Sequence, residues 1–170
     1  MKIEIEREEN MLIIEKVIGN LNHRHGNTES PNVDYVDVEW HETHKKIHKK
    51  VTASGEEIGM RFDDHILVHG LIQDDILYEQ DGKVIAVNIP PCDAIVIDIE
   101  DTHLIPKVCY EVGNKHAPFF RGEGHNQFIT PYDKPLEVLL QKLGVKTKHE
   151  EVKLDFTKAI STSLGGHHHH

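Results

Sequence analysis

Residues 108–120, VCYEVGNKHAPFF, decide the predicted fold of the C-terminal half of the chain. An apolar helical run ends here with Val112, and Gly113 and Asn114 follow it. Both residue types tolerate the left-handed conformation that ends a helix, so a helix stop is predicted at this pair. His116 comes directly afterwards, and the chain then returns to apolar residues. The segment therefore predicts an imidazole, a potential metal ligand, at a rigid corner of the fold.

Six elements are predicted around this corner. The helix that ends there carries its apolar residues on one face, and Pro106 limits where it begins, because proline is accepted only in a first turn. A second helix is predicted between Asp133, which can cap it, and Gly144, which stops it. The predicted strands span residues 92–99, 127–130 and 145–154, and one more begins at residue 119. The order β-α-β-β-α-β is the ferredoxin-like pattern.

The N-terminal half is predicted to consist of short strands and turns, with almost no helix. Apolar and polar residues alternate in several segments, of which residues 36–40 and 58–62 are the clearest. Asp81 and Gly82 are predicted to form a two-residue hairpin turn between two strands. This half is therefore interpreted as an all-β domain.

A pair of prolines, Pro90 and Pro91, marks the predicted boundary between the two halves. Two prolines stiffen the backbone and cannot donate the hydrogen bonds of a sheet. The predicted fold class is α+β: an N-terminal all-β domain over residues 11–90, followed by a ferredoxin-like domain over residues 92–155. Residues 156–170 are predicted to be a disordered, flexible tail that contains histidine.

Two histidine pairs in the N-terminal half have a spacing of four residues: His44 with His48, and His65 with His69. On a helix, each pair would share one face and could chelate a metal. Both segments are instead predicted to be strands, in which positions four apart lie about 13 Å apart. The sequence therefore predicts that neither pair binds a single metal ion.

Composition argues against several classes of protein. The net charge is -10 with neutral histidine, and a nucleic-acid surface needs clustered lysine and arginine, so no nucleic-acid partner is expected. No stretch of about 18 apolar residues occurs, so no membrane span is expected. The acidic residues 1–10 lack the apolar core of a signal peptide and are interpreted as an N-terminal extension, with Met11 as a candidate for the true start. With only two cysteines and no secreted disulfide framework, a cytoplasmic protein is expected.

Histidine is unusually frequent, with 15 residues in 170. Four of them form the C-terminal run His167, His168, His169 and His170. This run is interpreted either as the remnant of a purification tag behind a Gly-Gly spacer or as a native metal-binding tail, since short His-rich tracts bind metals. Both interpretations stay open. Imidazole suits nickel, copper and zinc, so metal binding is the chemistry that the sequence favours.

The motif Gly-Asn-Lys-His at residues 113–116, preceded by Cys-Tyr-Glu, closely resembles the Gly-Asn-Arg/Lys-His motif of the UreE family. That family comprises urease accessory proteins, the nickel chaperones for urease. The resemblance runs from about residue 11 to about residue 153, and it includes VDYVDVEW at residues 33–40 and GKVIAVNI at residues 82–89. The same order of segments over most of the chain makes the resemblance specific.

The resemblance implies a peptide-binding-like N-terminal domain and a homodimer formed through the ferredoxin-like domain. In such a dimer the two copies of His116 come together, and the tail histidines, residues 167–170, complete a site for Ni²⁺. Zn²⁺ and Cu²⁺ are the expected competitors. The implied partners are a urease accessory GTPase and the urease activation complex. The implied function is delivery of Ni²⁺ to apo-urease during urease maturation, by a protein that is not an enzyme.

The chain departs from the family pattern in two places. Some relatives carry a His-X-His pair about fifteen residues after the motif, whereas residues 130–133 here are Thr-Pro-Tyr-Asp, so no second internal site of that kind is predicted. His125 and His149 lie near in the sequence and are weaker candidate ligands, because histidine is often merely exposed. Lys115 replaces the commoner arginine, which keeps the charge and loses the planar fork.

Catalytic motifs are absent from the sequence: it has no Gly-X-Ser-X-Gly segment, no phosphate loop, and no Gly-X-Gly-X-X-Gly segment after a strand. Two alternatives to nickel delivery stay open. The first is a His-rich protein that buffers or stores nickel or zinc. The second is a peptide-binding interaction module whose metal binding is incidental.

Overall fold

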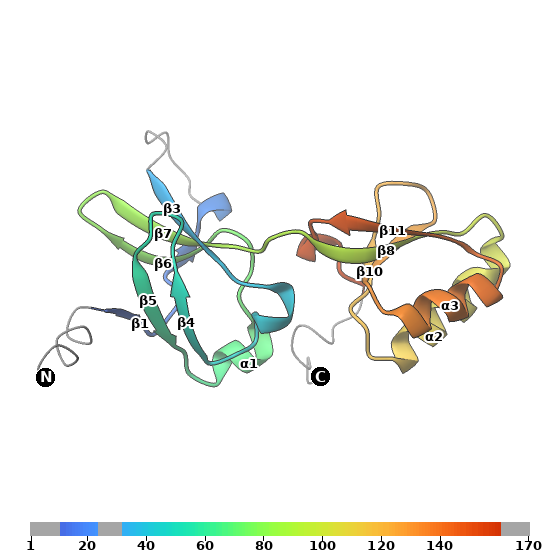
Figure 1. Cartoon of the computed structure of the whole chain (residues 1–170), viewed down its shortest axis with the longest axis horizontal. Helices are drawn as coiled ribbons and strands as arrows, with labels where there is room; N and C mark the ends of the chain where they lie inside the picture. Colours follow the sequence, from blue (N-terminus) through green and yellow to red (C-terminus); the bar gives the residue numbers. More distant parts are fainter. Residues whose placement is uncertain (1–10, 24–31, 161–170) are drawn as a thin grey trace, which may run out of the picture. The chain divides into compact units, whose positions relative to one another are not determined.

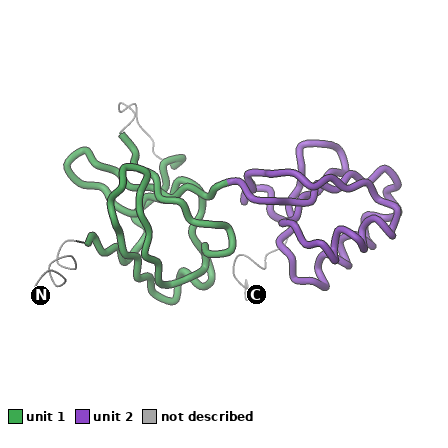
Figure 2. Tube along the Cα trace, in the orientation of Figure 1, with its two compact units in different colours: residues 1–90 green, residues 91–170 purple. Residues whose placement is uncertain are grey.

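The computed structural model describes residues 11–23 and 32–160 (Figure 1). The chain divides into two compact units, Met1–Pro90 and Pro91–His170, which Figure 2 shows in green and purple. The first unit is built of strands with one short α-helix, and the second combines a sheet with two α-helices. The predicted α+β class is therefore confirmed. No helix in the described part of the chain is long and apolar enough to cross a bilayer.

The first unit contains two sheets, with the strand orders β1-β5-β4 and β2-β6-β7-β3. Its strands and α-helix are β1 Leu12–Ile14, β2 Gly19–Asn20, β3 Val33–Asp37, β4 Ile47–Val51, β5 Glu57–Arg61, α1 His65–His69, β6 Asp75–Gln80 and β7 Lys83–Asn88. Two short 3-10 turns, Leu21–His23 and Trp40–Glu42, connect them. The predicted all-β architecture is confirmed apart from the helix α1.

Apolar patterning explains where the strands of this unit are buried. Ile58 and Met60 alternate along β5 and are both buried, whereas residues 84–87 of the central strand β7 are buried without a break. A continuous apolar run is typical of a strand that is covered on both faces. The predicted hairpin between β6 and β7 is also confirmed: Asp81 and Gly82 have φ values of 51° and 77°, the two positive values that a type I′ turn requires.

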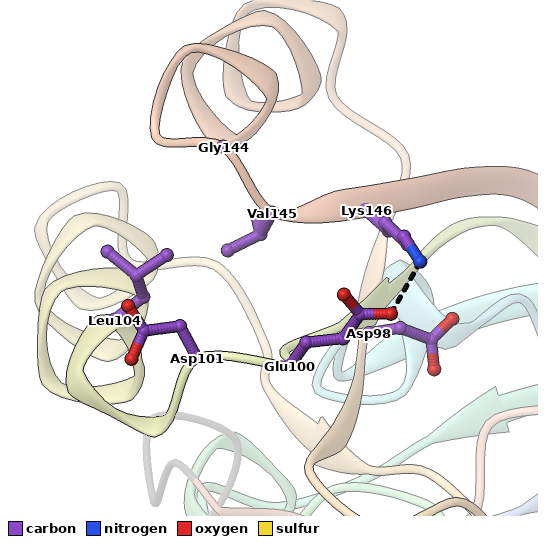
Figure 3. Close-up of a pocket in the computed structure, with 7 residues that line it drawn as sticks. All are labelled: Asp98, Glu100, Asp101, Leu104, Gly144, Val145 and Lys146. Atoms are coloured by element: carbon purple, nitrogen blue, oxygen red, sulfur yellow. Dashed lines mark hydrogen bonds and ion pairs between the residues drawn. The ribbon is translucent and has the colours of Figure 1, made fainter.

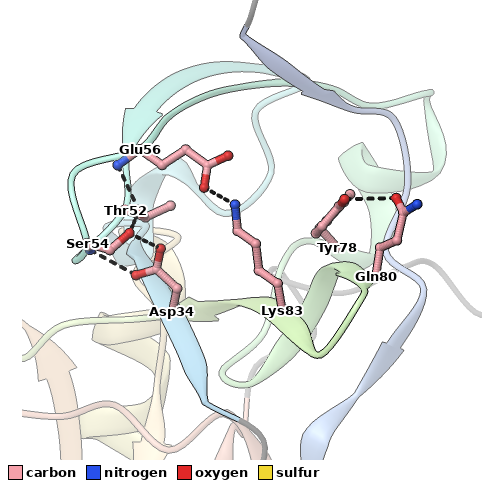
Figure 4. Close-up of polar contacts among 7 residues, drawn as sticks. All are labelled: Asp34, Thr52, Ser54, Glu56, Tyr78, Gln80 and Lys83. Carbon is pink, nitrogen blue, oxygen red and sulfur yellow. Dashed lines mark hydrogen bonds and ion pairs between the residues drawn. The ribbon is translucent and has the colours of Figure 1, made fainter.

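Polar contacts connect the two sheets of the first unit (Figure 4). On β3, the Asp34 carboxylate accepts hydrogen bonds from the Ser54 backbone N–H at 2.9 Å and from the Ser54 hydroxyl at 2.6 Å. On β7, Lys83 forms an ion pair with Glu56. Ser54 and Glu56 both belong to the connection between β4 and β5, so these contacts hold that hairpin against the strands of the other sheet.

The helix α1 corrects the prediction of a strand at residues 65–69. The N–H of His65 donates to Asp63 Oδ1 at 2.9 Å at its start, and Ile66 is buried. Gly70, with φ 66°, ends the helix and donates its N–H to the Ile66 carbonyl. The prediction was wrong because an Asp before the segment and a Gly after it are helix start and stop signals, and they outweigh the weak strand pattern between them.

The second unit has the strand order β11-β8-β10-β9, and every neighbouring pair is antiparallel. Its elements are β8 Cys92–Asp98, a 3-10 turn Thr102–Leu104, α2 Ile105–Asn114, β9 Phe120–Arg121, β10 Gln127–Pro131, α3 Lys134–Lys142, β11 Lys146–Val152 and a 3-10 turn Phe156–Lys158. This is the β-α-β-β-α-β order of a ferredoxin-like domain, with both helices on one face of the sheet (Figure 1). Pro106 lies in the first turn of α2, where proline is tolerated.

Apolar side chains hold both helices of the second unit on its sheet. Val108 and Val112 from α2, and Leu136 and Leu140 from α3, have no exposed surface. They belong to one core cluster with Ile95, Ile97, Ile99, Phe119 and Val145. Burial of one such side chain stabilises the fold by about 1.5–3 kcal/mol. The cluster therefore fixes the position of α2 and of the residues at its end.

Residues 156–160, which the sequence assigned to the flexible tail, are in contact with the rest of the second unit. Phe156 meets Phe120 edge-on, with ring centroids 5.5 Å apart, and Ala159 forms a β-bridge to Phe120. The N–H of Ile160 donates to the Phe119 carbonyl at 2.7 Å. Residues 156–160 therefore pack beside β9 through the Phe156 ring and two backbone contacts. The rest of the predicted tail, residues 161–170, and the predicted extension, residues 1–10, lie outside the described residues.

His48 on β4 is a buried histidine, whereas His44 lies in the turn before that strand. The predicted strand is thus confirmed for His48 and not for His44. Nε2 of His48 lies 3.0 Å from the Lys45 carbonyl oxygen, and Phe62 meets the ring edge-on. Burial lowers the pKa of His48 below the usual 6.5. The folded protein therefore favours the neutral imidazole.

We expect the free energy of unfolding to decrease as the pH falls below about 6.5, because unfolded His48 binds a proton that the buried ring resists. A His48→Gln variant should lose less stability between about pH 7.5 and about pH 5, since glutamine does not titrate and can still donate to the Lys45 carbonyl. Urea unfolding of both proteins at both pH values measures the difference. Glu42 changes the free energy of unfolding mainly below this pH range, because the hydrogen bond from Lys50 lowers the pKa of its carboxyl to about 2. Equal losses in the two proteins would contradict the expectation.

Candidate metal centre

The helix α2 ends in a Schellman motif, and His116 is its left-handed residue. The N–H of Ala117 donates to the Val112 carbonyl at 3.3 Å, and the N–H of His116 donates to the Gly113 carbonyl at 2.9 Å. The φ of His116 is 51°. The helix ends at Asn114, as the Gly113–Asn114 stop predicted, but the left-handed residue is His116, two residues further on. The histidine itself occupies the position that glycine usually fills.

Packing on both sides of His116 explains this conformation. Val112 before it and Phe119 after it are buried in one core cluster, and Ala117 packs against the same cluster. The chain must therefore turn between these anchors, wherever glycine stands in the sequence. A left-handed conformation costs a non-glycine residue about 1–2 kcal/mol, which the core contacts offset. The imidazole is exposed. A strained residue that is exposed to solvent leads to the hypothesis that it has a functional role.

Lys115, the residue before His116, connects the end of α2 to the start of α3. Its Nζ lies 3.6 Å from Asp133 Oδ2, and the same oxygen accepts the N–H of Leu136 at 2.8 Å as the cap of α3. The positive charge also lies at the negative end of the α2 dipole, where it is favourable. Because the contact uses a single carboxylate oxygen, the planar fork of an arginine is not needed for it.

His125 and His149, the weaker predicted ligands, have separate surroundings. His125 is exposed in the turn between β9 and β10. His149 on β11 stacks on Tyr132, with ring centroids 3.8 Å apart, and its Nε2 lies 3.4 Å from Asp93 Oδ1. Across residues 11–23 and 32–160, no three His, Cys, Asp or Glu side chains come together as a metal-binding group. The predicted tail ligands, His167 to His170, lie outside the described residues.

Cys109 on α2 is a less favourable metal donor than an exposed imidazole. Its side chain is half-buried, and burial raises the pKa of the thiol. The thiolate, which is the form that binds a metal, is therefore disfavoured. This leaves His116 as the imidazole that the α2 corner presents.

An acidic pocket lies in another part of the second unit (Figure 3). It has a volume of about 130 Å³ and is lined by Asp98, Glu100, Asp101, Leu104, Gly144, Val145 and Lys146. Lys146 Nζ lies 2.5 Å from Glu100 Oε1 and neutralises part of the negative charge. None of the predicted metal ligands lines this pocket, and its volume is small for an organic substrate.

Two family models match this chain. The model of the UreE urease accessory protein N-terminal domain matches residues 14–90, and that of the C-terminal domain matches residues 93–170. Urease accessory protein UreE of Helicobacter pylori strain P12 is 42% identical over 153 residues, which cover 90% of this chain and 88% of that protein. The protein of the same name from Acetivibrio thermocellus is 37% identical over 158 residues, or 93% of this chain and 95% of the relative.

The chain belongs to the UreE family. The two matched ranges of the UreE domains meet near Pro90 and Pro91, where the chain also divides into its two units. The resemblance inferred from the Gly-Asn-Lys-His motif is therefore confirmed over most of the chain.

The motif identified His116 but did not reveal its left-handed backbone. Nor did the sequence reveal that His65 and His69 lie on one helix, α1, with their rings stacked. The signals that would have found this pair are Asp63 before the segment and Gly70 after it, which are helix start and stop residues.

We expect a His116→Gly variant to raise the free energy of unfolding by about 1 kcal/mol, because glycine adopts a positive φ without the Cβ clash. The same change removes the imidazole, so metal binding by this residue is lost together with the strain. Chemical denaturation of the variant and the unchanged protein measures the effect on stability. His116→Ala, which keeps the Cβ, should show no such increase.

Gly113→Ala distinguishes the observed left-handed residue from the one that the sequence predicted. Gly113 lies inside α2, and a Cβ there meets no atom within 4 Å. Alanine should therefore stabilise the helix, by about 0.5–1 kcal/mol. Destabilisation by Gly113→Ala, with no gain from His116→Gly, would show instead that Gly113 is the left-handed residue.

Proposed function

We propose that this chain binds Ni²⁺ and carries it for urease maturation, as a metallochaperone and not as an enzyme. Membership in a family of urease accessory proteins supports the role in urease maturation. The observation that favours metal carriage is the exposed imidazole of His116 on a backbone corner that the core holds in place. Imidazole suits Ni²⁺, and Zn²⁺ and Cu²⁺ compete for the same donor.

A homodimer would supply the second ligand of the site. One imidazole does not hold a metal tightly, and the described residues of one chain bring no group of three ligands together. In a two-fold dimer of the second unit, His116 occurs twice and both copies can face one ion. Tyr110 on α2 is 66% exposed, and aromatic side chains are enriched in protein interfaces, which supports a contact surface on this helix. The tail histidines, residues 167–170, would add further donors.

A metal site with few fixed protein ligands suits a protein that carries metal better than one that stores it. A recipient can replace solvent or tail ligands one at a time, so the metal passes on without the site having to unfold. The recipient in this proposal is the urease activation complex, reached in the cytoplasm through a urease accessory GTPase. The first unit, with its two sheets, would provide contacts to these proteins.

Buffering or storage of nickel or zinc is the second candidate function, and the 15 histidines of the chain favour it. Deletion of the gene distinguishes nickel delivery from buffering or storage. Loss of the gene would leave urease activation normal if the protein only buffers metal, and would impair it if the protein delivers nickel. Partner binding that is indifferent to chelators would point instead to an interaction module with incidental metal.

Calorimetric titration with Ni²⁺ tests the proposed site. Three proteins are compared, with their masses in solution: the full chain, a chain that ends at Leu164, and His116→Ala. We expect His116→Ala to lose the tight site and the shortened chain to keep most of it, with the full chain a dimer. If the shortened chain loses all binding and His116→Ala changes nothing, the metal binds the four terminal histidines and the proposed site is wrong.

The same titration should depend on pH. Imidazole binds metal only when neutral and has an ordinary pKa near 6.5, so the affinity for Ni²⁺ should fall below about pH 6. Titrations at about pH 7.5 and about pH 5.5 measure this. Equal affinity at both values would exclude imidazole as the main ligand.

A further inference from the structure

The helix α1 places two imidazoles side by side on the first unit, which does not contain His116. His65 and His69 are the first and last residues of this helix, and both are exposed. Their ring centroids lie 3.9 Å apart, and the ring planes differ by 23°. The pair is therefore already assembled in the folded chain.

The backbone of α1 is fixed at its start and through its middle. The N–H of His65 donates to Asp63 Oδ1 at 2.9 Å, which fixes the turn that leads into the helix. Ile66 is buried and anchors the helix in the core. Directly after the helix, the N–H of Leu71 donates to the Thr43 carbonyl at 2.8 Å, and the Leu71 side chain is buried.

The end of α1 is closely covered as well. Gly70 ends the helix with φ 66°, and a Cβ at this position would lie 2.7 Å from Cε1 of His44. The His44 ring therefore lies against the Gly70 backbone and leaves it little room to move. With both ends of the helix held, the two imidazoles start from fixed Cα positions, which reduces the entropy lost when they bind one ion.

We propose that His65 and His69 form a chelating site for one late first-row divalent cation, such as Ni²⁺, Cu²⁺ or Zn²⁺. Residues four apart on a helix face the same side, and two histidines at this spacing are a known arrangement for metal binding. Two nitrogens bound to one ion at about 2.1 Å lie roughly 3 Å apart, so the stacked rings have to rotate about their side-chain bonds until both lone pairs point at the ion. Solvent fills the remaining coordination positions.

Charge around the pair favours a cation. Asp63 and Asp64 directly precede it, and Asp64 is paired with Lys46 at 2.6 Å, so one of the two carboxylates is neutralised by lysine. The chain carries a net charge of -10, which attracts cations in general. No third His, Cys, Asp or Glu of the described residues joins the pair. The site therefore binds more weakly than a three-ligand centre and exchanges its metal readily.

Binding at this pair is independent of the proposed nickel carriage, because neither residue belongs to the family motif. Among the three cations, Cu²⁺ should bind most tightly, since affinity at nitrogen sites rises to Cu²⁺ and falls again at Zn²⁺.

Nuclear magnetic resonance of the full chain, labelled at histidine, tests the proposal with Ni²⁺ as the probe. The imidazole signals of His65 and His69 are assigned with His65→Gln and His69→Gln, and Ni²⁺ is added to an excess over all histidines. We expect both signals to broaden together, because the bound ion is paramagnetic. In either single variant, the Ni²⁺ concentration that broadens the remaining signal should rise at least about tenfold, since the second ligand is lost.

A variant with Leu67→His and His69→Gln is the matched control. It keeps two histidines on α1 but places them two residues apart, on different sides of the helix. Leu67 is 51% exposed, so the exchange should leave the melting temperature unchanged. This variant should bind no better than His69→Gln alone. His116→Ala should leave the response of His65 and His69 unchanged, which separates this site from the proposed dimer site.

Two outcomes would overturn the proposal. In the first, excess Ni²⁺ leaves the His65 and His69 signals sharp, so there is no site. In the second, His65 responds equally with and without His69, so each ring binds alone and no chelate forms. A joint response in the unchanged chain that persists in the Leu67→His control would count against the helical spacing as its cause.

Discussion

The packing of α2 and α3 on one face of the four-stranded sheet is the constraint on which the candidate metal centre depends. Val108 and Val112 are fully buried and anchor α2, and Phe119 returns the chain to the same core a few residues later. The backbone between these anchors has little freedom, so the turn must fall at His116, whose φ is 51°. The core thus places the imidazole, and solvent exposure leaves it able to bind.

A left-handed histidine gives up stability that glycine would provide at the same position. Proteins keep such strain where function depends on the residue, because stability above the level that function requires brings no advantage. In the proposed metal site, the His116 imidazole would be one of two equivalent ligands. It has low affinity alone, and in the dimer proposed above a two-fold axis would bring a second copy to the same ion. Strain and exposure at His116 are the two observed features from which the proposed metal site is argued.

Burial separates histidines that look alike in the sequence. His48 is enclosed in the first unit, where desolvation lowers its pKa and favours the neutral ring. His65 and His69 have the same four-residue spacing as His44 and His48, yet they lie exposed and stacked on a helix. The high histidine content therefore does not give all the histidines of this chain the same role. Its consequences depend on whether each ring faces the core or the solvent, and on which element carries it.

The sequence by itself determined the class of the fold, the β-α-β-β-α-β order and the motif residue His116, because apolar periodicity, proline and turn chemistry act over a few residues. It also determined the family, since the motif recurs within matching segments along most of the chain. The helix at residues 65–69 was also within reach of the sequence, because Asp63 and Gly70 are local start and stop signals. Only the tertiary structure decided that His116 rather than Gly113 is left-handed, and that residues 156–160 pack beside β9. In each of these cases, contacts between residues distant in the sequence, or anchoring to a buried core, outweighed the local preference of the chain.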